Sequence, residues 1–269
     1  ERILFLDGAM GTLLQKQGLK PGECPELWNL EHPDRILSVH QAYIEAGSDI
    51  INTNTFGGNG LKLKEYGLES RLKEINTAGV EIAKKAAKQA GRTVFVAASM
   101  GPVGEFLKPL GPLSFEELSD LYEAQIKALA EAGADILNFE TMVDIGELRC
   151  AVLAARRVAP GLPVFAHLTF TDSGRTLTGS DALSGFNILS GLGADFVGMN
   201  CGLGPDDMAK LIQGINTLIP SGIVVQANAG IPKLIDGQTV FTCSAHHYME
   251  QLEAVMAEGV NVVGGCCGT

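Results

Sequence analysis

The chain alternates short runs of β-branched and apolar residues with longer segments in which apolar positions recur every three or four residues. The short runs predict buried strands and the longer segments predict amphipathic helices. Eight strands are predicted: Ile3–Leu6, Ile50–Thr55, Val94–Ala98, Ile136–Phe139, Val164–Phe170, Phe196–Met199, Ile223–Ala227 and Val260–Val263. Because strands that alternate with helices pair in parallel through right-handed crossovers, this pattern predicts an α/β fold.

Capping residues mark several helix boundaries. Ser114 precedes the predicted helix Phe115–Ala132 and Glu117 follows three residues later, which is the pattern of a capping box. Further helices are predicted over Pro33–Ala46, Asp144–Ala159, Pro205–Leu218 and Ser244–Glu258. The sequence stops at Thr269, two residues after Cys267, so we expect this chain to lack an eighth helix and the natural polypeptide to continue.

A fourfold repeat begins at Gly47, Gly133, Gly193 and Gly259, the glycines that follow predicted helices. The copies open the second, fourth, sixth and eighth strands. Alternate strands of a barrel contribute side chains to one layer, so the seventh and eighth residues after each glycine should meet at the C-terminal rim. These are Asn54 and Thr55, Glu140 and Thr141, Asn200 and Cys201, and Cys266 and Cys267. The repeat predicts a single-domain (β/α)8 TIM barrel over residues 1–269, with an open doubly wound sheet as the alternative.

Composition narrows the class of protein. A chain of 269 residues with 46% hydrophobic side chains buries a large core, so any metal should serve chemistry rather than stability. The net charge of -11 argues against nucleic acid and anionic membranes as partners. No apolar run approaches a membrane span or a signal peptide, and six cysteines are too few for a disulfide scaffold. We therefore expect a cytoplasmic protein with reduced thiols.

Three of the cysteines, Cys201, Cys266 and Cys267, fall at the predicted rim between glycines. Three soft ligands suit zinc and leave the fourth tetrahedral position for substrate, as in catalytic zinc sites. A free thiol has a pKa near 8.5, and coordination deprotonates it, so such a centre would activate a substrate thiol as a nucleophile. The alternative is that these cysteines are small buried residues or a vicinal disulfide. For Cys24, Cys150 and Cys243 we favour a purely structural role.

Six motifs lie at or just after the ends of the predicted strands: Asp7–Thr12, Asn52–Gly57, Phe139–Thr141, Met199–Gly202, Asn228–Gly230 and Gly264–Thr269. Together they resemble the homocysteine S-methyltransferase family, and most closely the homocysteine-binding barrel of its cobalamin-dependent methionine synthase branch. The similarity covers essentially the whole chain. One departure is Ala227, where that branch usually has proline before Asn-Ala-Gly.

The resemblance implies a (β/α)8 barrel with one Zn²⁺ held by Cys201, Cys266 and Cys267, and L-homocysteine as the methyl acceptor. The donor in that branch would be methylcobalamin carried by another module or protein. This chain lacks the Asp-x-His-x-x-Gly run that binds cobalamin, so we do not expect it to bind the donor alone. Betaine and S-methylmethionine are the donors of stand-alone relatives.

Polar residues at the predicted strand ends are candidates for contact with the amino acid. Asp7 and Glu140 could orient its ammonium group as catalytic and substrate-binding residues, the alternatives being a turn cap and a rim salt bridge. Thr53, Asn200 and Asn228 are further substrate-binding candidates, or could orient rim loops. His167 is either a core residue or a support for a cysteine or Glu140.

Segments outside these motifs carry weaker expectations. We expect a loop over Gln15–Glu31 that could act as a lid, a rim loop over Thr171–Asp181, and solvated side chains at His246 and His247. A second class of enzyme also remains open, because glycine-rich turns after the last two strands bind phosphate in many barrels. That aldolase or isomerase would have structural cysteines, but no lysine stands at a strand end to form a Schiff base.

Overall fold

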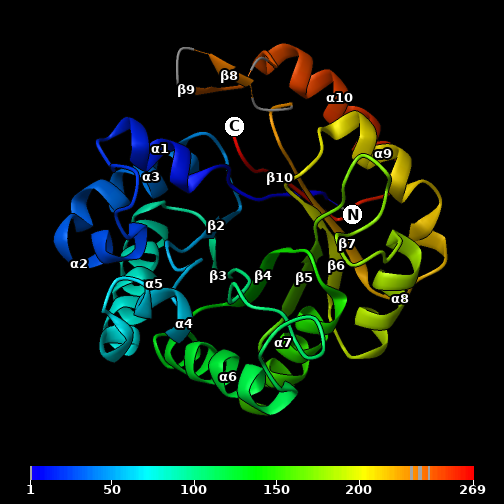
Figure 1. Cartoon of the computed structure of the whole chain (residues 1–269). Helices are drawn as coiled ribbons and strands as arrows, with labels where there is room; N and C mark the ends of the chain where they lie inside the picture. The colour runs from blue at the N-terminus through cyan, green and yellow to red at the C-terminus, as the bar shows by residue number, and fades with distance from the viewer. Residues whose placement is uncertain (1, 231–232, 236–237, 242) are drawn as a thin grey trace.

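Eight parallel strands form a closed barrel in the computed structural model, which describes residues 2–230, 233–235, 238–241 and 243–269 (Figure 1). The strands run β1-β10-β7-β6-β5-β4-β3-β2 around the sheet, and the bridge between Leu6 and Ile50 joins β1 to β2. The TIM barrel prediction is therefore confirmed. The strands are β1 (Leu4–Phe5), β2 (Ile50–Asn52), β3 (Phe95–Met100), β4 (Ile136–Met142), β5 (Val164–Leu168), β6 (Phe196–Asn200), β7 (Gly222–Ala227) and β10 (Val262–Gly265).

Helices form a ring around the strands (Figure 1). They are α1 (Met10–Lys16), α2 (Trp28–Glu31), α3 (Pro33–Glu45), α4 (Gly60–Lys64), α5 (Leu72–Gln89), α6 (Phe115–Glu131), α7 (Ile145–Val158), α8 (Ala182–Gly191), α9 (Pro205–Ile212) and α10 (Ala245–Ala257). The capping box of Ser114 and Glu117 is present at the start of α6. Within the described residues, no helix follows β10.

The fourfold repeat has a structural explanation at the N-terminal end of the barrel. Its four glycines all adopt positive φ, between 78° and 108°, a conformation that glycine adopts without a Cβ penalty. Two residues later, a carboxylate or amide accepts a hydrogen bond from the backbone of a neighbouring strand. Asp49 accepts from Phe5, and Asn261 accepts from Ile223. In the other two copies, Asp135 accepts from the Val96 backbone and Asp195 accepts from the Val164 backbone.

The strands alternate between two environments, as β4 shows. Leu137 and Phe139 face outward into the large core between the sheet and the helices, whereas Ile136 points into the barrel with Phe165 and Val224. Higher in the barrel, toward the C-terminal ends of the strands, the inward positions become polar. Five inward side chains of this polar part are buried: Asn52, Ser99, Asn138, His167 and Gln226. The barrel therefore has an apolar base beneath a polar upper half.

Two sequence expectations need correction, and one further element was not expected. The helix expected over Pro205–Leu218 ends at Ile212, and a 3-10 turn follows at Ile215–Thr217 after Gly214, whose φ is 71°. The loop expected over Gln15–Glu31 is in part helical, because α1 ends at Lys16 and a 3-10 turn (Pro25–Leu27) leads into α2. An antiparallel hairpin, β8 (Lys233–Ile235) with β9 (Gln238–Val240), was not predicted.

Candidate metal centre and substrate cavity

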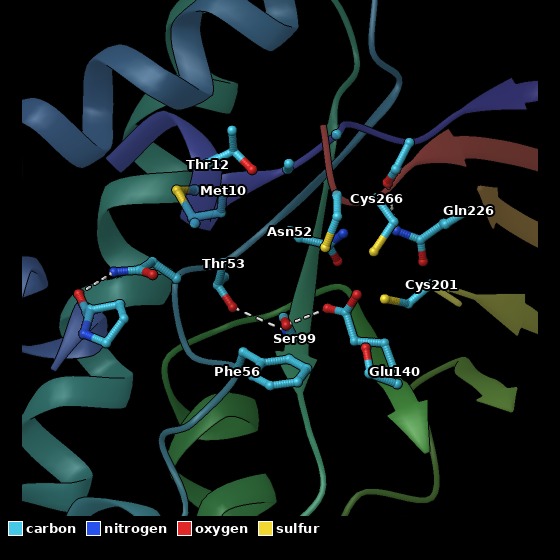
Figure 2. A pocket seen from close by; sticks show the side chains of 18 of the residues that line it. Met10, Thr12, Asn52, Thr53, Phe56, Ser99, Glu140, Cys201, Gln226 and Cys266 are labelled. Carbon is cyan, nitrogen blue, oxygen red and sulfur yellow. Dashed lines mark hydrogen bonds between the residues drawn. The ribbon is translucent and has the colours of Figure 1, made fainter. Parts of the chain in front are cut away.

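Three cysteine sulfurs meet at the C-terminal rim of the barrel. Cys201 follows β6, and Cys266 and Cys267 follow β10, yet their Sγ atoms all lie within 4.8 Å of one another. Figure 2 shows the sulfurs of Cys201 and Cys266 on the same side of the cavity. All six cysteines are free thiols. The expected gathering of these three thiols at one mouth is thus observed.

The backbone at this site is held in unusual conformations. Cys201 has a φ of 58° and the following Gly202 has a φ of 72°. A non-glycine residue in this region is strained, and such strain clusters at functional sites. The backbone N–H of Cys201 donates to Gln226 O at 3.1 Å, that of Cys266 donates to Ala227 O at 2.8 Å, and that of Cys267 donates to Asn228 Oδ1 at 3.0 Å. The end of β7 and the next residue, Asn228, therefore position all three cysteines.

Hydrogen bonds among the three thiols shift their pKa values in opposite directions. Hydrogen bonds from the Cys266 and Cys267 thiols lower the pKa of Cys201, while the same contacts with Cys201 raise the pKa values of Cys266 and Cys267. A cluster that already stabilises one thiolate, with all sulfurs close together, matches the donor set of a soft divalent cation. The residues present fit a metal centre.

Glu140 lies beside the thiols, at a break in β4. The pairing of β4 with β5 shifts between Phe139 and Met142, and Thr141 has a φ of 63°, which is a genuine outlier for a β-branched residue. Ser99 Oγ donates to Glu140 Oε1, and Asn200 Nδ2 lies 3.5 Å from Glu140 Oε2. Burial raises the pKa of Glu140 to about 7, while the Ser99 hydrogen bond lowers it. This carboxyl group can therefore change charge near neutral pH.

Asp7 is buried and is not one of the residues that line the cavity. Its two oxygens accept hydrogen bonds from the backbone N–H and the side-chain Nδ2 of Asn52, at 2.8 Å and 3.0 Å. Burial raises its pKa well above the usual value, against the lowering effect of these bonds. The cavity wall at this point is formed by the residues that follow, Gly8 to Thr12, and by Asn52. Asp7 thus orients Asn52, and its predicted direct contact with substrate stays a prediction.

A cavity of about 330 Å³ opens above the thiols. Its wall includes the turn at Gly8–Thr12, Pro25 and Glu26, Phe56, and Glu140 with the three cysteines. All of the lining residues belong to the described part of the chain, and none of them is basic. A small acidic cavity with a thiol cluster suits a short amino acid with a sulfur atom better than a phosphate dianion.

Of the other predicted substrate-binding residues, Thr53 is part of the cavity wall, whereas Asn200 and Asn228 are not. Thr53 Oγ1 lies 2.6 Å from Thr55 Oγ1 and accepts from the Ser99 backbone. Asn200 and Asn228 are buried, and each touches the cysteine cluster through a hydrogen bond. His167 is fully buried inside the barrel. The residues expected to lie outside the site are not part of the cavity wall. They are the exposed His246 and His247, the buried Cys24 and Cys150, and the partly exposed Cys243.

Sequence reasoning missed the wall formed by Glu26. This side chain is 5% exposed, and its Oε1 accepts from the Gly57 backbone at 2.7 Å. Asn54 Nδ2 donates to Asn29 Oδ1, and Asn29 Nδ2 donates to the backbone carbonyl of Asn54, which fixes the same segment to the loop after β2. The expected lid is therefore a wall clamped to its neighbour. No signal in the sequence singles it out, because Glu26 is one of three glutamates in this segment and nothing distinguishes it from Glu23 and Glu31.

Comparisons with known proteins agree with this geometry. The family described as Homocysteine S-methyltransferase matches residues 4–269. The chain belongs to this family. Two similar curated proteins are methionine synthases: that of Mycobacterium tuberculosis is 34% identical and that of Mycobacterium leprae 32% identical, each over 100% of this chain. The chain spans only 24% and 23% of their respective lengths, about a quarter.

A solved structure with a similar fold is the metallated form of the homocysteine methyltransferase MmuM from Escherichia coli. It superposes with a TM-score of 0.82 at 26% identity, covering 100% of this chain and 93% of that one. The match extends the family assignment to the whole barrel. No helix in the described residues has the length and hydropathy of a membrane span.

Proposed function

We propose that this chain activates the thiol of L-homocysteine for methyl transfer, giving methionine, with one Zn²⁺ held by Cys201, Cys266 and Cys267. The observation that carries the proposal is the convergence of the three sulfurs on the wall of one cavity. Family membership supports this interpretation over the phosphate-binding aldolase or isomerase, and so does a cavity wall without basic residues.

Zinc bound by three thiolates lowers the pKa of a fourth thiol and so makes it nucleophilic at neutral pH. The chain's own residues hold the amino acid in place. Glu140 provides the carboxylate nearest the thiols for the substrate ammonium group, and Asp7 acts with it by fixing Asn52. Thr53, Asn200 and Asn228 orient the substrate and the rim. The substrate sulfur then forms its bond to the methyl carbon as the bond from methyl to donor breaks, leaving the electron pair on the donor.

We propose methylcobalamin as the donor, carried by another module or protein. The support is that the similar methionine synthases are about four times as long as this chain. In this proposal residues 1–269 are one homocysteine-binding module of a longer protein. The stand-alone alternative uses betaine or S-methylmethionine. The similarity to the separate homocysteine methyltransferase MmuM keeps that alternative in the test.

One experiment tests both parts. Wild-type chain, Cys266→Ala and Cys267→Ala are assayed for bound zinc and for methionine formation from homocysteine with methylcobalamin, betaine and S-methylmethionine side by side. We expect about one zinc per wild-type chain, methyl transfer from methylcobalamin, and loss of both in the two variants. Cys243→Ala is the matched control and keeps both. Full zinc content and unchanged turnover in the Cys266 and Cys267 variants would refute the proposal.

A further inference from the structure

A layer of polar side chains lies inside the barrel, directly beneath the site. The strand register and the alternation of inward positions place Ser99, His167 and Gln226 in one layer, because alternate strands share a level. The layer above holds Glu140, Asn200 and Cys266. The layer below holds Asn52, Asn138, Gly198 and Gly264, so two of its four positions carry no side chain.

Several atoms of these layers lack a protein partner. Asn138 Nδ2 donates to Asn52 Oδ1 at 2.9 Å, which fixes the orientation of the amide, but Asn138 Oδ1 accepts no hydrogen bond from the described residues. Gln226 Oε1 and both ring nitrogens of His167 likewise have no hydrogen-bond partner among the described residues, although a backbone contact with Met199 acts to raise the pKa of His167. All three side chains are at least 98% buried. Buried polar atoms are almost always paired, and an unpaired one destabilises the fold.

The chemistry of the set points to one kind of ligand. Burial lowers the pKa of His167 to about 3, so the ring is neutral and offers one donor and one acceptor. Two amide oxygens and one ring nitrogen are therefore acceptors that cannot pair with one another. A water molecule donates two hydrogen bonds and accepts others, and buried waters typically make about three. One water that donates to the two amide oxygens and accepts from the imidazole N–H would satisfy three of these four unpaired atoms.

We propose that Asn138, His167 and Gln226 hold an internal water beneath the cysteine cluster, and that His167 is a positioning residue acting through it. Gln226 lines the cavity, and its Nε2 lies 3.5 Å from the carbonyl of Gly265, the residue before Cys266. Its backbone carbonyl accepts from Cys201. A fixed Gln226 therefore holds the backbone at Cys201 and next to Cys266 in place. The positioning role rests on the proposed function, whereas the water site does not.

The test combines a structure with kinetics. A high-resolution crystal structure of the wild-type chain should show a water within hydrogen-bond distance of Asn138 Oδ1, Gln226 Oε1 and a His167 ring nitrogen. Replacing His167 by leucine should remove this water and lower methyl transfer about tenfold, whereas His167→Gln, which keeps a donor and an acceptor, should restore most of the rate. His40→Leu, at another buried histidine without a partner among the described residues, controls for loss of a core imidazole and should leave the rate unchanged.

Two results would overturn the inference: a wild-type structure in which the three side chains bond directly to one another with no water, or a His167→Leu variant with the wild-type rate. If the leucine variant does not fold, the wild-type structure alone decides the water site, and His167→Gln with retained water and rate supports it. If the wild-type chain transfers no methyl group from any donor, the proposed function fails, while the water site is still decided by the structure.

Discussion

Asn200 Nδ2 lies 3.9 Å from Cys266 Sγ, so an amide at the end of β6 touches a thiol that follows β10. The same amide nitrogen lies 3.0 Å from Thr141 Oγ1, and Asn200 Oδ1 accepts from the Thr141 backbone at 2.6 Å. Asn200 therefore connects the strained end of β4, which carries Glu140, to the cysteine cluster. A neutral hydrogen-bond donor suits this position, because the Asn200 amide lies between the sulfur of Cys266 and the carboxylate of Glu140.

The variant Asn200→Asp should weaken zinc binding about 10- to 100-fold, since it replaces a donor by a negative charge beside thiolates. Competition with a chelator of known affinity measures the change. Asn261→Asp is the matched control: it lies at the opposite end of the barrel, where the three other copies of the repeat already carry aspartate. It adds the same charge and should leave zinc affinity unchanged. Equal zinc affinities for Asn200→Asp and the wild-type chain would contradict the assigned role.

Zinc should protect three of the six cysteines from alkylation. In the metal-free protein, Cys201 reacts fastest with iodoacetamide, because its neighbours lower its pKa. Cys24 and Cys150 react slowly in both states, since burial raises their pKa values to about 12. Mass spectrometry of peptides from zinc-loaded protein should show protection at Cys201, Cys266 and Cys267, with partly exposed Cys243 still modified. Protection spread evenly over all six would indicate folding rather than a site.

The pH dependence of substrate binding should follow Glu140. The Ser99 hydroxyl lowers the pKa of this buried carboxyl, so Ser99→Ala should raise it above its value of about 7. A hydrogen bond to a charged group contributes about 1.5–3 kcal/mol, which corresponds to roughly one to two pH units. Homocysteine binding at pH 7 should weaken, and its midpoint should move to higher pH in a calorimetric series. Ser99→Thr keeps the hydroxyl and should retain the wild-type midpoint, whereas a midpoint unchanged in Ser99→Ala would exclude this coupling.

Much of this architecture could be predicted because it depends on local signals. The glycines of the repeat mark helix ends, and the residues seven and eight positions later reach the rim, as Glu140 and Cys201 do. The capping box at Ser114 follows from two side chains three residues apart. Each of these features depends on residues that are close together in the sequence, so the sequence pattern alone predicts them.

Other features depend on contacts between distant residues and left little trace in the sequence. Glu26 reaches the cavity only because Asn29 and Asn54 clamp its segment to the loop after β2. Ser99 lies one residue past the predicted strand Val94–Ala98, and its role depends on Glu140 of the neighbouring strand. Likewise, Asp7 follows the first strand near the cavity, but both of its oxygens accept hydrogen bonds from Asn52. The direction of a side chain at the rim depends on its contacts with neighbouring strands. The sequence of a single strand does not contain this information.

A buried histidine far from the site should make the fold sensitive to acid. Burial lowers the pKa of His40 from 6.5 to about 4, so between these values the unfolded chain binds a proton that the folded chain does not. Stability is therefore present above pH 6.5 and is lost as pH falls toward 4. This shift in the pKa of His40 corresponds to about 3 kcal/mol in the free energy of unfolding. In urea titrations of metal-free protein, His40→Gln should lose correspondingly less stability over this range, whereas His246→Gln, at an exposed position, should follow the wild-type curve. Parallel curves for His40→Gln and wild type would show that this imidazole is not desolvated.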